Sequence, residues 1–175
     1  MLTFEIAKTE TAMKEIKLEY KVRSYPSPEE LPEISRELIF MAREAARRAY
    51  APYSGYRVGA AVLLENGVFI TGNNQENAAY PSGLCAERTA LFYASSKYPD
   101  VAILALAVTA LSNDLLPEGF AKPCGGCRQV IAEYEDRSGK PIEIILDGSS
   151  AIMVMEGIDT LLPFRFKKEE LSRKK

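Results

Sequence analysis

The 175-residue sequence contains no histidine, and this absence excludes several kinds of active site. A Ser-His-Asp triad or a Cys-His pair cannot form. A His-Glu-x-x-His metalloprotease site and a Cys₂His₂ zinc finger are excluded for the same reason. Any side chain that transfers protons must be a carboxylate, a lysine, a cysteine or a tyrosine. A transition-metal site would have to depend on cysteine, of which there are three.

The chain also has little excess charge and no long apolar run. Its 22 Lys+Arg and 24 Asp+Glu residues leave a net charge of −2, whereas a dedicated nucleic-acid binder needs a basic face. No apolar stretch approaches the roughly 20 residues of a membrane-spanning helix. Residues 1–5 lack the basic-then-apolar pattern of a secretion signal. We expect a cytoplasmic protein with reduced thiols that binds neither nucleic acid nor membranes.

The pattern of apolar residues predicts three helices and five strands in one domain, which we place at residues 29–175. Helical spacing or a helix-start signal marks three segments, which are 29–50, 85–97 and 124–134. Continuous apolar runs or hairpin signals mark five strands, which are 56–65, 68–71, 102–111, 142–146 and 151–155. Helices that alternate with buried strands predict an α/β fold, a three-layer α-β-α sandwich with a mixed five-stranded sheet.

Residues 1–28 are expected to form an N-terminal extension that contains one extra strand. Ile16, Leu18, Tyr20 and Val22 alternate with charged residues, and this period of two is typical of a half-buried strand. The sequence leaves open whether the strand pairs within its own subunit or with another one.

The three cysteines are placed where helices are predicted to begin. Cys124 and Cys127 form a Cys-Gly-Gly-Cys motif, which puts both sulfurs on one face of a first helical turn. Cys85 lies at the start of another predicted helix. Because helix N-termini carry partial positive charge, they stabilise thiolates. Two helix starts could bring the three thiolates to one Zn²⁺ and leave the fourth tetrahedral position to water, as in catalytic zinc sites.

Simpler interpretations of the cysteines remain open at this point. A Cys-x-x-Cys motif can be a redox pair, and Cys85 could be a small buried apolar residue. A structural site with four ligands would need a carboxylate, because no histidine is available to complete it.

Charged neighbours of the cysteines favour a catalytic site. Glu87 lies two residues after Cys85 and could reach over a pocket beside the metal, where a carboxylate can accept a proton from zinc-bound water. Three thiolates and one Zn²⁺ carry a net charge of −1, which calls for a nearby cation. Arg88 lies on the same helical face as Cys85 and can donate to the thiolates. Arg128 is a weaker candidate for this role.

Four sequence segments resemble the small, homotetrameric, zinc-dependent cytidine deaminases with a Cys₃ metal site. They are Tyr53–Ala61, Gly72–Tyr80, Cys85–Ala90 and Pro123–Val130. A weaker fifth match is Leu161–Pro163 with Phe166, so the resemblance covers about residues 38–171. The order and spacing of these segments make the resemblance specific, and the Cys₃ deaminases are a well-defined class of zinc enzymes.

The resemblance implies the roles of the residues around the metal. Cys85, Cys124 and Cys127 would hold one Zn²⁺ per subunit, and Arg88 would temper the thiolate charge. Glu87 would be the general acid and base, taking a proton from zinc-bound water and protonating N3 of cytosine. The resulting hydroxide would attack C4, and Glu87 would then pass a proton to the departing amino group.

The resemblance also implies a binding site for a nucleoside. Asn74 and Glu76 would hydrogen-bond the 3′-hydroxyl of ribose, and the backbone at Ala86 would meet the pyrimidine edge. Tyr56, where the family usually has Phe, would pack on the nucleoside.

Two more aromatic residues, Tyr80 and Phe166, would approach the site of a neighbouring subunit in a homotetramer with shared active sites. The implied activity is hydrolysis of free cytidine and 2′-deoxycytidine to uridine and 2′-deoxyuridine, with release of ammonia, in pyrimidine salvage.

Three other functions fit the sequence less well than cytidine deamination. A deaminase of a related nucleoside such as blasticidin S is disfavoured by Arg88 and by the Asn74–Glu76 pair. A polynucleotide-editing deaminase is disfavoured by the net charge of −2. A non-enzymatic zinc or thiol-redox module would have no use for Glu87 or for residues 72–80.

Overall fold

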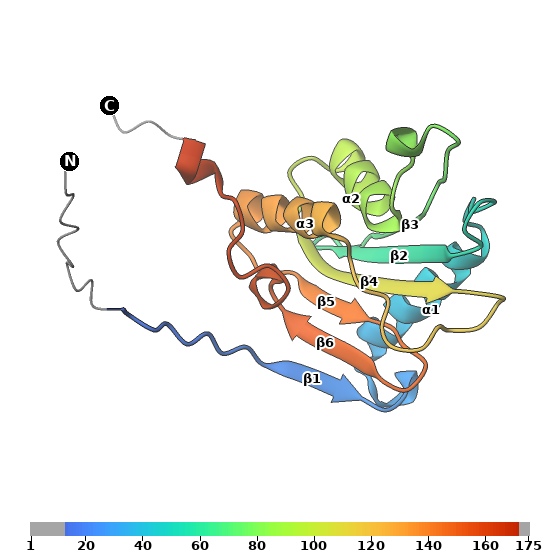
Figure 1. The fold of residues 1–175 in the computed structure, drawn as a ribbon, viewed down its shortest axis with the longest axis horizontal. Helices are drawn as coiled ribbons and strands as arrows, with labels where there is room; N and C mark the ends of the chain where they lie inside the picture. The colour runs from blue at the N-terminus through green and yellow to red at the C-terminus, as the bar shows by residue number, and fades with distance from the viewer. Residues whose placement is uncertain (1–12, 172–175) are drawn as a thin grey trace, which may run out of the picture.

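Six strands and three helices account for the fold of residues 13–171, which are the residues that the computed structural model describes (Figure 1). The helices are α1 (Glu33–Arg47), α2 (Ala86–Lys97) and α3 (Gly125–Ser138). The strands are β1 (Val22–Tyr25), β2 (Arg57–Leu64), β3 (Phe69–Asn73), β4 (Ile103–Leu111), β5 (Glu143–Leu146) and β6 (Ile152–Glu156).

The strands form one mixed sheet in the order β1-β6-β5-β4-β2-β3. Only β4 and β5 pair in parallel, because α3 lies between them in the chain and returns it to the same end of the sheet. The other pairs are antiparallel. Short connections join β2 to β3 and β5 to β6, whereas β2 pairs with β4, and β1 with β6, across longer stretches of the chain. The predicted mixed sheet is confirmed, and β1 is the extra strand expected in the N-terminal extension.

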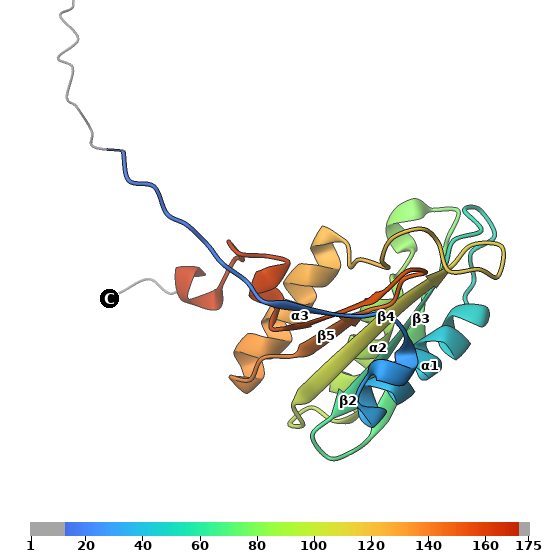
Figure 2. The ribbon, with the colours of Figure 1, turned by 90° about the horizontal axis from the view of Figure 1, so that it is seen from below.

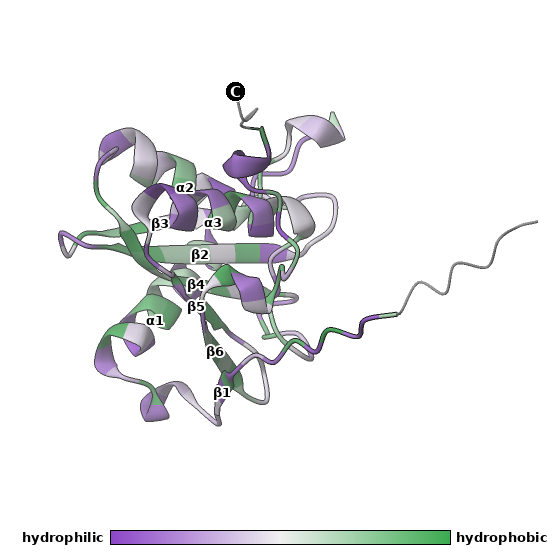
Figure 3. Ribbon diagram, turned by 90° about the vertical axis from the view of Figure 1, so that its left-hand side faces the viewer, coloured by the Kyte–Doolittle hydropathy of each residue, from purple (hydrophilic) through white to green (hydrophobic). Residues whose placement is uncertain are grey.

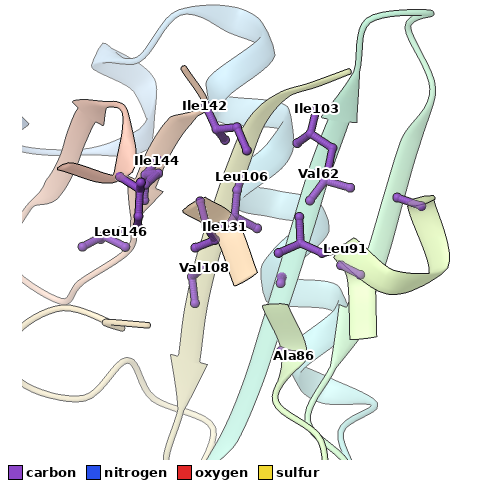
Figure 4. Close-up of a cluster of buried hydrophobic side chains, with 14 of the residues drawn as sticks. Val62, Ala86, Leu91, Ile103, Leu106, Val108, Ile131, Ile142, Ile144 and Leu146 are labelled. Atoms are coloured by element: carbon purple, nitrogen blue, oxygen red, sulfur yellow. The ribbon is translucent and has the colours of Figure 1, made fainter. Parts of the chain in front are cut away.

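Helices cover both faces of the sheet, so the predicted three-layer sandwich is confirmed (Figures 1 and 2). One core lies between α1 and the sheet, where Leu38 and Ile39 pack with Ala107 and Ile145. A second core lies under α2 and α3 (Figure 4) and includes Leu91, Ile131, Val62, Leu106 and Ile144. Burial of such side chains is the main favourable term in folding, and it fixes both helices against one face.

Gly72 allows α2 to lie unusually close to the sheet. A Cβ atom there would be 2.5 Å from the backbone nitrogen of Ala90 and 2.6 Å from the carbonyl oxygen of Ala86. Any larger residue would therefore displace the first turns of α2. Thr89 adds a side-chain hydrogen bond to the carbonyl of Asn73, at 3.2 Å. These contacts set the position of the start of α2.

Two predicted segments differ from the observed elements. The helix expected at 29–50 is shorter, because Pro28–Glu30 forms a separate 3₁₀ turn and Pro32 directly precedes α1. The strand expected around residues 16–22 begins only at Val22, since β6 pairs with Val22–Tyr25 and no further.

The hydropathy colouring follows the layers, with apolar strands at the centre and polar faces on the outside of the helices (Figure 3). Within residues 13–171, no helix has both the length and the apolar character needed to cross a membrane.

Candidate active site

The N-termini of α2 and α3 bring the three cysteines together. Cys85 is the residue directly before α2, Cys124 directly precedes α3, and Cys127 lies in the first turn of α3. The Sγ atoms of Cys85 and Cys124 are 3.9 Å apart, and those of Cys124 and Cys127 are 3.5 Å apart. All three sulfurs lie within 4.8 Å of one another. The predicted convergence of two helix starts is therefore observed.

This sulfur geometry fits a zinc ion. Zn–S bonds of about 2.3 Å in a tetrahedron place neighbouring sulfurs about 3.8 Å apart, close to the separations observed here. Cys127 is buried, Cys85 is half-buried and Cys124 is exposed, so the trio lies between the core and the surface. Three ligands leave a fourth position for water or substrate, as catalytic zinc sites do.

The cysteines differ in how readily they ionise. A hydrogen bond with the Cys127 thiol and the nearby guanidinium of Arg88 lower the pKa of Cys85 to about 5. The same bond to Cys85, together with burial and the carboxylate of Glu87, raises the pKa of Cys127. Because thiols bind zinc as thiolates, metal binding must release the proton that Cys127 holds.

Arg88 contacts the sulfur of Cys85. Its Nη2 atom donates to the sulfur of Cys85 at 3.4 Å, and that contact raises the pKa of the guanidinium. Its buried Nε atom has no hydrogen-bond partner among residues 13–171. Arg128 instead donates to the carbonyls of Pro123 and Leu161, both at 2.9 Å, so it holds the loops around α3.

Glu87 is a buried carboxyl group beside the cysteines. It lies in the first turn of α2 and is only 4% exposed. Burial raises its pKa, and the negative charge of Cys85 acts in the same direction. A raised pKa makes a carboxyl group better able to hold and then donate a proton. The arrangement therefore combines a proton-transfer group with a candidate metal site.

Backbone pairing brings the loop after β3 against the start of α2. Gln75 and Leu84 exchange two backbone hydrogen bonds, each of 2.9 Å. Leu84 directly precedes Cys85, so Gln75 is held next to the cysteine trio. Asn74 and Glu76 are the neighbours of Gln75 in the chain. The structure thus places this polar loop at the edge of the candidate active site.

Asn74 positions the chain around Tyr56. Its Oδ1 accepts from the backbone amide of Val58 at 2.7 Å, and its Nδ2 donates to the carbonyl of Tyr56 at 3.0 Å. Tyr56 is 41% exposed, and its partial burial raises the pKa of its hydroxyl.

Glu76 holds the preceding turn. It accepts hydrogen bonds from the backbone amides of Tyr53 and Ser54 and from the Ser54 hydroxyl. The Ser54 hydroxyl is the main reason why the pKa of Glu76 is lowered. A carboxylate has about four lone-pair sites, so Glu76 keeps capacity for another donor. Sequence reasoning missed Ser54, whose small polar side chain resembles that of any turn residue.

The remaining predicted binding residues lie at different depths. Ala86 is fully buried at the start of α2. Phe166 is 53% exposed, and its carbonyl accepts from Gln129 on α3, which ties this segment to the helix that carries Cys127. Tyr80 is 91% exposed in a 3₁₀ turn, so the rest of the described chain makes little contact with it.

Comparison with known proteins identifies the same region. The family model for the cytidine and deoxycytidylate deaminase zinc-binding region matches residues 32–138. A cytidine deaminase of Sporosarcina psychrophila is 42% identical over 136 residues, which cover 78% of this chain and 93% of that protein. A cytidine deaminase of Halalkalibacterium halodurans is 43% identical, over 77% of this chain and 96% of the relative.

Solved structures agree with this result. The crystal structure of cytidine deaminase from Burkholderia pseudomallei superposes with a TM-score of 0.63 at 36% identity, and the match covers 74% of this chain and 97% of that chain. A cytidine deaminase structure from Mycobacterium tuberculosis gives a TM-score of 0.59 at 33% identity, over 75% and 95% of the two chains. Fold, cysteine geometry and sequence agree: the chain belongs to the cytidine and deoxycytidylate deaminase family of zinc-dependent hydrolytic deaminases.

Proposed function

We propose that the protein hydrolyses free cytidine and 2′-deoxycytidine to uridine and 2′-deoxyuridine, with release of ammonia, in pyrimidine salvage. The observation that carries the proposal is the buried carboxyl of Glu87 beside three converging sulfurs, in a chain of the cytidine deaminase family. A redox pair of Cys124 and Cys127 would leave Glu87 and the contact between Cys85 and Cys124 without a purpose.

The chain supplies both the metal ligands and the proton carrier. Cys85, Cys124 and Cys127 would hold zinc, which acts as a Lewis acid and lowers the pKa of a bound water. Glu87 accepts a proton from water and delivers it to N3 of the base, so that the water oxygen can bond to C4. Glu87 then carries the second proton to the amino group, and the C4–N4 bond breaks as ammonia leaves. The guanidinium of Arg88 would offset the negative charge of the thiolates at every step.

The loop residues suit a nucleoside. Glu76 would accept a hydrogen bond from the 3′-hydroxyl of ribose, with Asn74 beside it, while the part-exposed ring of Tyr56 would pack on the nucleoside. Backbone groups at Ala86, next to the metal ligand Cys85, would meet the pyrimidine edge. The proposal is supported by the pairing of Gln75 with Leu84, which holds this loop next to Cys85.

Neighbouring subunits would complete each site in a homotetramer. Tyr80 is 91% exposed and Phe166 is 53% exposed, as expected of aromatic side chains that meet a second subunit. A cytoplasmic location would keep the three thiols reduced and able to bind metal.

A substrate panel tests this proposal. The zinc-loaded protein is assayed by absorbance with cytidine, 2′-deoxycytidine and blasticidin S, and its metal content is measured in parallel. We expect turnover of the first two substrates only and about one zinc per chain. Cys124→Ala should lose both zinc and turnover. Absence of cytidine turnover at full zinc loading would refute the proposal, and turnover of blasticidin S alone would reassign the substrate.

A further inference from the structure

The segment before β1 extends away from the body of the molecule. Residues 13–21 form no strand, and no described strand pairs with them. Figures 1 and 2 show this part of the chain continuing outward from β1, with none of the described elements alongside it. We call residues 15–21 the N-terminal arm. It leaves the sheet from an edge strand, which is where a further strand can add.

Apolar side chains on the arm and at Val22, the residue that follows it, are exposed. Ile16 is 73% exposed, and Leu18, Tyr20 and Val22 are each between 43% and 46% exposed. They alternate with charged residues, a pattern visible as alternating colours in Figure 3. Such alternation places the apolar side chains on one face of an extended chain and the charges on the other. An extended segment with one apolar face is suited to pairing with another strand.

The sequence of the arm is complementary to itself in an antiparallel pair. If Leu18 of one copy lies opposite Leu18 of a second copy, Ile16 faces Tyr20 across the ladder. On the other face, Lys17 lies opposite Glu19 and Glu15 opposite Lys21. Within one chain Lys17 already forms an ion pair with Glu19, because both side chains lie on the same face. Oppositely charged and apolar cross-strand pairs stabilise antiparallel ladders.

We propose that the arms of two copies of this chain pair as an antiparallel ribbon, with a twofold axis through Leu18. The observation that selects a second copy as the partner is that every charged position of the arm meets its opposite charge in this register. A shift of the pairing by one residue would place apolar side chains opposite charged ones. The apolar faces of the two arms would then lie on opposite sides of the ribbon. The ribbon would extend β1 of each copy and so connect the two six-stranded sheets.

Covalent trapping suits this contact, because a short two-stranded ribbon has little stability by itself. Directly opposed residues in an antiparallel pair have Cα atoms about 4.5–5.5 Å apart, which a disulfide can bridge. The test uses the full-length, zinc-loaded chain with Leu18→Cys in a mildly oxidising buffer. The matched control is Ile16→Cys, whose two copies would lie about 13 Å apart along the ribbon.

The proposal predicts position-specific cross-linking. Above the level of the unsubstituted chain, Leu18→Cys should give about tenfold more disulfide-linked dimer than Ile16→Cys, because only the former satisfies disulfide geometry. A mixture of Ile16→Cys and Tyr20→Cys chains should form linked heterodimers. Equal cross-linking at positions 16 and 18, or none at 18, would overturn the proposal. The second result would also be found if the arm folded back onto its own subunit.

Charge variants provide an independent test by native mass spectrometry of the full-length chain. Glu15→Lys with Glu19→Lys makes the arm uniformly positive, and Lys17→Glu with Lys21→Glu makes it uniformly negative. Each charge variant also carries Leu18→Cys. Alone, each should form little disulfide-linked dimer, and a mixture of the two should form linked heterodimers. The control exchanges Lys17 and Glu19, which keeps every pair complementary and should trap like the parent. Unchanged trapping in the uniformly charged variants would contradict the assigned register.

Discussion

Glu87 on α2 and Glu135 on α3 are both buried carboxyl groups on the same side of the sheet, but their surroundings differ. Glu87 is 4% exposed and Glu135 is 7% exposed, and burial raises the pKa of each. Glu135 accepts hydrogen bonds from the backbone amides of Ile142 and Ile158 and forms an ion pair with Arg165. Glu87 instead faces the thiols of the cysteine trio.

Burial alone therefore does not distinguish an acid that supports the fold from one that is positioned for proton transfer. Glu135 links α3 to the chain around Ile142 and Ile158. Its oxygens are already occupied by two backbone amides and by Arg165. Burial also raises the pKa of Glu87, but this residue lies at the start of a helix beside candidate metal ligands. A buried acid whose hydrogen bonds are satisfied by backbone amides supports the fold. A buried acid beside metal ligands is placed for proton transfer.

The substitution Glu87→Gln should produce the largest effect on turnover. The amide keeps the size of the side chain but cannot carry a proton, so kcat for cytidine should fall by about 10²–10⁴-fold. Zinc content and melting temperature should stay close to those of the parent, since burial already disfavours the charged form. Steady-state kinetics with metal analysis provide the measurement. Retained turnover would remove Glu87 from the proposed mechanism.

Glu135→Gln is the matched control on the neighbouring helix, with the opposite expected outcome. Its amide retains one acceptor oxygen but loses the charge that Arg165 and the two backbone amides contact, so unfolding free energy should fall by about 2 kcal/mol. The kcat of the folded protein should be unchanged. Urea denaturation and kinetics below the transition measure both quantities. A large loss of kcat without destabilisation would erase the distinction between the two acids.

Arg88→Met should give the smallest effect of the three substitutions, and the quantity it should change is the affinity for zinc. The side chain keeps much of its apolar bulk but no longer donates to Cys85, so zinc affinity should weaken by about tenfold. The kcat at saturating zinc should change much less. Competition with a chromogenic chelator measures the affinity, and Arg128→Met, which removes bonds to two carbonyls instead of a sulfur, is the control. Equal affinities of parent and Arg88→Met would contradict charge compensation.

The sequence predicted the metal site well because local signals define it. Cys85 and Cys124 each follow a loop and precede a helical pattern, and Arg88 is one turn beyond Cys85. The alternation of helices and apolar strands likewise predicted the layers, because a sheet buried on both faces needs continuous apolar strands.

Features that depend on tertiary contact were not predictable in the same way. Glu135 looks like an ordinary surface charge until the residues around Ile142 and Ile158 fold against it. Gly72 has no distinctive local context, and its role depends on how closely α2 approaches. The alternation over residues 16–22 indicated a strand, but the point at which pairing begins depends on the length of β6.

Ammonia release by the zinc-loaded protein tests the central claim most directly. With cytidine as substrate, we expect one ammonia and one uridine for each cytidine consumed, because water replaces the amino group at C4. The same sample should contain about one zinc per chain, held by the three thiolates. A fully zinc-loaded protein that releases no ammonia from cytidine would contradict the proposed deamination.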